Sequence, residues 1–151
     1  MKRRVEDLVG QELDTAVALA EGWQLMFDGR GWVEPNFIPG VAGERIDCSV
    51  FHAAPLPWST DWAHGGPLLE RERIATWPTV LCADLYDVRE DGADQLHWSA
   101  LHPDSRHLGG WRDNMGGLDV TARDGMPGAT PLIAGMRAWV QAKFGDEIDL
   151  V

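Results

Sequence analysis

Cysteine is scarce in this chain. Its two cysteines, Cys48 and Cys82, are far apart and form no CxxC pair. A small secreted domain held together by disulfides would carry more of them, so we expect both to be reduced thiols in a cytosol. The 151 residues fit one domain that can bury enough apolar surface to fold without disulfides or metals. We therefore expect a single domain over residues 1–151.

Long apolar runs and basic residues are also in short supply. No segment approaches the ~20 apolar residues of a membrane span, and no apolar stretch of a signal peptide follows the basic start "MKRR". The chain has 13 basic and 24 acidic residues, which give a net charge of −11. That charge disfavours binding to duplex nucleic acid, although it can equally serve solubility. The sequence thus predicts a cytoplasmic protein with neither a membrane anchor nor direct contact with DNA.

Tryptophan, in contrast, is abundant. The chain has 8 tryptophans, and each indole combines a large apolar body with one N–H group that needs a hydrogen-bond partner. Two uses are open for such a surplus: a core built on indoles, or an aromatic recognition surface. We favour the core and keep the recognition surface as the alternative.

Apolar spacing predicts a helix near each end of the chain. Residues 5–21 place apolar side chains at helical intervals and stop before Gly22. A second helix is expected over residues 131–144, with Thr130 as its N-cap and Gly145 as its stop. The apolar positions are Val5, Leu8, Val9, Leu13, Ala16, Val17 and Ala20 in the first helix, and Leu132, Ile133, Met136, Trp139, Val140 and Phe144 in the second. In the second helix we expect Ile133, Met136 and Val140 to be buried.

Short strand-like runs lie between these helices. "WQLMF" and "WVE" flank the turn residues "DGRG" and predict a hairpin over residues 23–34. Residues 35–57, rich in Pro and Gly, predict a surface loop with one short strand at "CSVFH". Residues 79–88 and 95–101 predict two strands joined by an acidic turn, and residues 102–129 a long loop. The expected fold is α+β, with a small antiparallel sheet covered by the N- and C-terminal helices.

The stretch "WSTDWAHGGPLLERERI", residues 58–74, holds the densest set of reactive side chains. Asp61 and His64 are three residues apart, so one helical turn places them on the same face. Glu70 and Glu72 follow a Gly-Gly-Pro bend that could fold them back. Such a group could act as general acid and base or bind a divalent metal. However, no Ser or Cys nucleophile is paired with it and its spacing matches no known metal motif.

A structural interpretation of the same stretch is simpler. Ser59, Thr60 or Asp61 caps a short helical turn that His64 fills, and Trp62 packs inward. Gly65 and Gly66 end that turn, and Pro67 opens the next one. The "ERER" charges then form a solvated helix face. We expect no catalytic residue, no metal and no cofactor here. The residues predicted to contact a ligand or partner are Trp58, Asp61, Trp62, His64, Glu70 and Arg71.

Histidine recurs every five residues at His97, His102 and His107. Positions five apart on a strand face opposite sides, so these side chains converge only if the chain bends at Pro103. The spacing therefore disfavours a metal site. The glycine pairs also lack the strand–loop–helix context and the lysine of a phosphate-binding loop.

Three blocks of the sequence carry a resemblance. "GQELDTAVALAEG", "WSTDWAHGGPLLERERI" and "TPLIAGMRAWVQAKFGDEIDL" together resemble the NinX-like family of small phage proteins, in the family's order. The resemblance implies a phage or prophage origin, a location in the host cytoplasm and an accessory, non-structural role. It supplies no catalytic residue and no ligand.

Two functions from different classes follow. One is a small adaptor or inhibitor that binds a host or phage protein through exposed tryptophans inside an acidic rim. The alternative is a small hydrolase or nucleotide-modifying enzyme centred on Asp61, His64 and Glu70. A third possibility, mimicry of DNA, would need the acidic residues in phosphate-like rows. These residues are instead scattered, apart from residues 84–94 and the tail. Because no recognised catalytic spacing is present and tryptophan is in surplus, we expect the protein-binding function.

Overall fold

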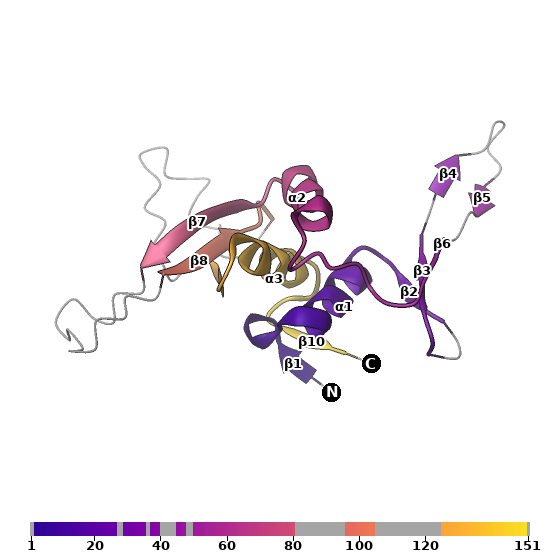
Figure 1. Cartoon of the computed structure of the whole chain (residues 1–151), viewed down its shortest axis with the longest axis horizontal. Coiled ribbons are helices and arrows are strands. Elements are labelled where there is room, and N and C mark those ends of the chain that lie inside the picture. Colours follow the sequence, from indigo (N-terminus) through magenta and orange to yellow (C-terminus); the bar gives the residue numbers. More distant parts are fainter. Residues whose placement is uncertain are drawn as a thin grey trace.

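The chain combines helices with small antiparallel sheets (Figure 1). A computed structural model describes residues 2–26, 29–35, 37–39, 45–47, 50–80, 96–104 and 125–150. Its α-helices are α1 (Gly10–Ala20), α2 (Trp62–Arg71) and α3 (Pro131–Phe144). The predicted α+β class is confirmed.

Helix α3 lies at the centre of the molecule and has the predicted bounds. The Thr130 hydroxyl accepts a hydrogen bond from the Ile133 N–H at 3.1 Å, and Gly145 ends the helix with a φ of 88°. Met136 and Val140 are fully buried, as expected, whereas Ile133 is only partly buried. Phe144 is 44% exposed, so its predicted place on the buried face is wrong. It is the last residue of α3.

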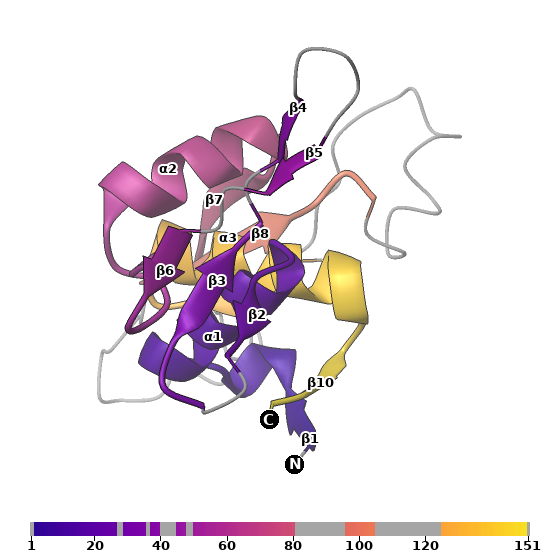
Figure 2. The same cartoon turned by 90° about the vertical axis from the view of Figure 1, so that its right-hand side faces the viewer.

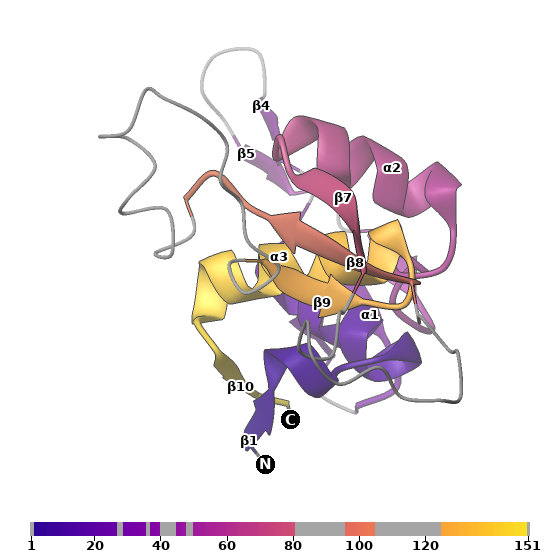
Figure 3. The same ribbon diagram turned by 90° about the vertical axis from the view of Figure 1, so that its left-hand side faces the viewer.

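One sheet packs directly on α3. Its strands β7 (Ala75–Val80), β8 (Leu96–Leu101) and β9 (Met126–Gly128) are antiparallel in that order, and Figure 3 shows them in front of the helix. Ala100 and Met126 are paired and buried. A Cβ on Gly128 would lie 2.4 Å from the Ala134 nitrogen, so only glycine allows β9 to approach α3 this closely.

The sheet confirms part of the predicted pattern and corrects the rest. β8 lies within the predicted 95–101 segment, and β7 begins at Ala75, before the predicted start at residue 79. The prediction of a loop through residues 126–128 is wrong, because these residues pair with β8. Pro127 is tolerated there because β9 is an edge strand, where a missing N–H costs little. The predicted acidic turn and residues 105–124 lie outside the described residues.

The predicted helix over residues 5–21 is interrupted. A single 3-10 turn, η1 (Val5–Asp7), comes first, and α1 begins only at Gly10. Gly10 has a φ of +52°, a left-handed conformation that a right-handed helix cannot continue through. The break also serves packing, because the Leu8 carbonyl accepts a hydrogen bond from the buried Arg137 side chain of α3 at 2.9 Å. The same guanidinium donates to the Pro127 carbonyl of β9 at 2.6 Å.

Residues 32–35, 37–39, 45–47 and 50–52 form a hairpin arm. After β2 (Gln24–Leu25), β3 (Trp32–Glu34) pairs with β6 (Val50–His52), and β4 (Phe37–Pro39) pairs with β5 (Arg45–Asp47). The pairs Glu34–Val50 and Phe37–Asp47 have the same antiparallel register. The predicted hairpin over residues 23–34 and the predicted strand near residue 50 are confirmed. The surface loop predicted around that strand is wrong at residues 37–39 and 45–47, because these residues pair with each other as β4 and β5. The arm extends away from α3 (Figures 1 and 2).

Indoles fill much of the core. Trp23, Trp32, Trp58 and Trp139 are buried in one cluster with aliphatic residues of α1 and α3. The two ends of the chain meet beside this core, because β1 (Lys2–Arg4) pairs with β10 (Glu147–Asp149). The interpretation of tryptophan as core material is therefore correct for these four residues.

Candidate functional site

Helix α2 begins at a capping carboxylate. The Asp61 side chain accepts a hydrogen bond from the Ala63 N–H at 2.9 Å. The prediction of Asp61 as the cap is therefore confirmed, and the alternative caps Ser59 and Thr60 are wrong. Ser59 has a different role, because its N–H donates to the Asp14 carboxylate of α1 at 2.8 Å. Ser59 and Asp14 are both buried. This bond ties the start of α2 to α1.

The Gly-Gly-Pro sequence does not end a helical turn, contrary to prediction. Helix α2 runs through it without interruption. A Cβ on Gly65 would lie 2.2 Å from the Trp58 carbonyl and 2.7 Å from Leu132 of α3. Gly65 therefore marks a close approach between α2, the preceding loop and α3.

The two tryptophans of the predicted contact set have opposite environments. Trp58 is buried beneath α2, where its ring meets that of Trp23 edge-on with centroids 5.1 Å apart. Trp62 is 58% exposed, so the prediction that it packs inward is wrong. The inward positions of α2 are taken by Gly65, Leu68 and Leu69. The Trp62 ring lies beside Gly66 instead, where a Cβ would be 3.4 Å from the ring.

Asp61 and His64 come together, but Glu70 does not join them. His64 Nε2 lies 3.8 Å from Asp61 Oδ2, and both side chains are partly exposed. Glu70 is six positions after His64 in the same helix, which places it ~9 Å along the axis and ~120° around it. The three groups of the enzyme hypothesis are therefore not assembled into one site by the described structure.

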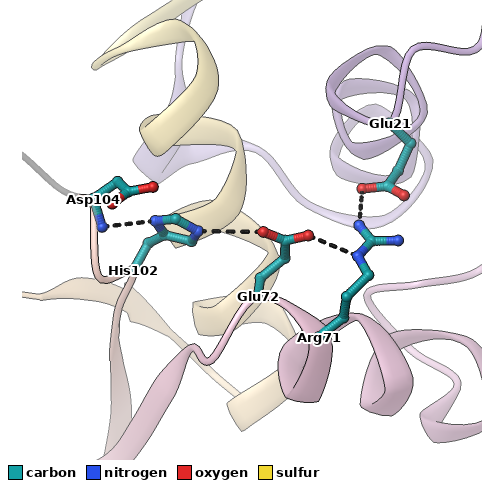
Figure 4. Close-up of polar contacts among 5 residues, drawn as sticks. All are labelled: Glu21, Arg71, Glu72, His102 and Asp104. Atoms are coloured by element: carbon teal, nitrogen blue, oxygen red, sulfur yellow. Dashed lines mark hydrogen bonds and ion pairs between the residues drawn. The ribbon is translucent and has the colours of Figure 1, made fainter.

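Arg71, also predicted to contact a ligand or partner, is engaged within the chain (Figure 4). Its guanidinium donates to Glu21, the C-cap of α1, and to Glu72, each at 2.6 Å. The hydrogen bond with Glu21 is the main reason that the pKa of Arg71 is raised, and Glu72 contributes as well. Arg71 thus links the end of α2 to the end of α1.

The network continues to His102, beyond the end of β8. Glu72 Oε2 lies 3.6 Å from Nε2 of the buried His102 ring. The ring's Nδ1 accepts a hydrogen bond from the Asp104 N–H at 3.0 Å (Figure 4). Burial alone would raise the pKa of Glu72, but the hydrogen bond and charge of Arg71, followed by His102, hold it below its ordinary value.

Glu72 and His102 were absent from the predicted contact set. The prediction of a solvated helix face is wrong for Glu72, whose position four residues after Leu68 and three after Leu69 places it beside the buried face. That helical phase could have identified it. His102 gave no comparable local signal, because its burial depends on Trp139 of α3, whose ring centroid is 5.2 Å away.

The remaining predictions concern metal ligands, membrane spans, the cysteines and the other histidines. Within the described residues, no three His, Cys, Asp or Glu side chains gather as metal ligands. The helices described in the structure are also too short or too polar to cross a membrane. Cys48, Cys82, His107 and Trp111 lie outside the described residues, and His97 is described only as part of β8.

Comparison with known proteins identifies the family. No curated protein matches this chain. The sequence pattern of the family described as "Bacteriophage P22, NinX" matches residues 4–143, a range that includes η1, the hairpin arm, α2 and nearly all of α3. The match is to the family's overall pattern and assigns no role to any residue. Because it covers most of the chain, this protein belongs to the NinX family of phage proteins.

Proposed function

We propose that this phage accessory protein works by binding another protein, of the host or of the phage, in the host cytoplasm. The observation that carries the proposal is the exposure of Trp62, 58% of whose surface is open to solvent. Tryptophan is among the residues most enriched at the energetic centres of protein interfaces. Trp62 also belongs to a helix that is firmly packed on its other side.

The binding surface that we propose is the outer face of α2, formed by Trp62, Ala63, Gly66, Pro67 and Glu70. These residues lie at intervals that place them side by side on the helix, away from the buried Leu68 and Leu69. Apart from Trp62 and Glu70 the face has short side chains, so a partner can approach the helix closely. Because α2 is already held against α3, little order has to be gained on binding.

Charge indicates the character of the partner. Asp61 precedes Trp62, Glu70 is exposed at the other end of the face, and the whole chain has a net charge of −11. Complementary potentials favour association and suppress wrong partners. The partner should therefore present an apolar pocket for the indole and basic residues around it.

A pull-down with matched variants tests the proposal. Tagged full-length protein should capture a discrete partner from phage-infected lysate, and the purified pair should bind roughly 30-fold or more weakly after Trp62→Ala. Phe51→Ala is the control, because Phe51 is 57% exposed but lies on β6 of the hairpin arm. Equal binding by wild type and Trp62→Ala, or an equal loss in the control, would contradict the proposed surface.

The alternative enzyme has its own test. The purified protein should show no turnover in a screen of phosphoesters, esters and nucleotides, with and without divalent metals. Turnover that is abolished by His64→Ala would replace the binding function with the enzyme. The separation of Glu70 from Asp61 and His64 along α2 favours the first result.

A further inference from the structure

The hydrogen bonds of His102 define which ring nitrogen carries the proton. Nδ1 accepts a hydrogen bond from the Asp104 N–H at 3.0 Å, so in the neutral ring the proton must be on Nε2. Nε2 is buried and has no partner within hydrogen-bond distance. The carboxylate of Glu72 is 3.6 Å away.

The surroundings of the ring hold charge on several elements. Glu72, at the end of α2, is the acidic side chain that approaches Nε2. Arg71 donates a 2.6 Å hydrogen bond to Glu72 and also pairs with Glu21, the C-cap of α1. Helix α3 contributes the Trp139 ring, on which the Lys143 ammonium lies 4.4 Å from the centroid. Asp104 is in the same turn as His102. These are the charged groups that the described residues place around the imidazole.

Protonation of the ring must break the hydrogen bond at Nδ1 and strengthen the contact at Nε2. An imidazolium has two N–H donors and no acceptor, so Nδ1 can no longer hold the Asp104 amide. At Nε2, the contact with Glu72 becomes a charge-assisted one. Histidine ordinarily changes charge between pH 5 and 8.

We propose that His102 is a pH-dependent switch at the end of β8. The neutral ring holds the turn at Asp104, whereas the protonated ring releases the Asp104 amide and is held by Glu72. Because Glu72 is anchored through Arg71 to Glu21, the protonated ring transfers its attachment from its own turn to helices α1 and α2. The proposal concerns this turn alone and is independent of partner binding.

Nuclear magnetic resonance of the 15N-labelled full chain between pH 5 and 8 tests the switch, because Asp and Glu ordinarily stay ionised over this range. At high pH the His102 ring should show the Nε2–H form. On acidification the Asp104 amide proton should move upfield, with the same midpoint as the ring nitrogens. A ring protonated on Nδ1 at high pH, or an Asp104 amide that stays constant while the ring titrates, would overturn the switch.

Two variants test separately the role of the His102 ring and the role of Glu72. His102→Asn places an amide oxygen near the position of Nδ1 but has no titratable group, so the Asp104 amide should not respond to pH. Glu72→Gln keeps the histidine and removes the balancing charge, so release of the Asp104 amide should occur at a lower pH. An unchanged midpoint in Glu72→Gln would show that Glu72 does not hold the protonated ring. The wild-type titration and the Glu72→Gln variant remain decisive if His102→Asn fails to fold.

Discussion

At the scale of single residues, buried polar side chains connect segments that secondary structure leaves apart. Asp14 of α1 accepts the Ser59 N–H ahead of α2, and Arg137 of α3 donates to carbonyls of Leu8 and Pro127. Each bond gives a backbone group a hydrogen-bond partner, at the cost of burying a charged side chain. Burial raises the pKa of Asp14, while the hydrogen bond from the Ser59 backbone acts in the opposite direction.

The raised pKa of Asp14 predicts the pH dependence of Asp14→Asn. A carboxyl whose pKa is raised by folding stabilises the fold most when it is protonated, and that contribution is lost as the pH rises through the folded pKa. Asparagine keeps an oxygen acceptor for the Ser59 N–H without a buried charge. Asp14→Asn should therefore be more stable than wild type at pH 7 in urea unfolding, by a margin that closes as the pH falls towards ~4.

Asp14→Ala is the control for this comparison. It removes the acceptor and leaves the Ser59 N–H unsatisfied, so it should lower the free energy of unfolding by about 1–3 kcal/mol at pH 7. A margin between Asn and Asp that widens as the pH falls would contradict the raised pKa.

At the scale of elements, the sequence predicts those whose limits are set locally. Thr130 and Gly145 bound α3 through their own backbone and side-chain bonds, and the turn residues before Trp32 predict the β2–β3 hairpin. The errors arise where distant contacts decide. The segment before α1 is tied to α3 by the bond from Arg137 to the Leu8 carbonyl, β9 forms by pairing with β8, and α2 continues through Gly65 where it closely approaches Trp58 and Leu132.

Alanine substitutions at the adjacent glycines of α2, Gly65 and Gly66, should have opposite effects on stability, because packing decides the first and helix propensity the second. Gly65→Ala should destabilise the protein by several kcal/mol, since its Cβ would lie 2.2 Å from the Trp58 carbonyl and the helix would have to shift. Gly66→Ala should stabilise it by up to ~1 kcal/mol, because its Cβ would make an ordinary contact and alanine favours helix. Thermal and urea unfolding of the two variants measure the difference. Equal effects would show that α2 does not pack through Gly65.

At the scale of the whole molecule, the predicted contact set is divided by the fold. Trp58 becomes core, Arg71 becomes an internal link, and Trp62 remains open to solvent. Composition reveals the surplus of tryptophan but does not show which indoles are buried. The location of each indole depends on which helix face meets α3. The Glu72–His102 contact likewise requires α2 and the end of β8 to be neighbours, which no local pattern encodes.

One continuous core leads to a prediction about the cooperativity of unfolding. Trp23 and Trp32 at the base of the hairpin arm belong to the same buried cluster as Val140 of α3 and Ile148 of β10. Elements that share one core lose their packing together, so we expect a single domain with a single urea transition and a slope of about 1–3 kcal/mol per M. Far-ultraviolet circular dichroism and tryptophan fluorescence should give the same midpoint.

The control for cooperativity is Arg137→Leu, which removes the bonds to Leu8 and Pro127. It should lower the urea midpoint because two carbonyls lose their charged donor, yet the two spectroscopic curves should still coincide. Fluorescence that changes at lower urea than circular dichroism would instead indicate that the hairpin arm and the indoles at its base unfold first. The arm and the α3 core would then be separate cooperative units, contrary to the single domain that the continuous cluster predicts.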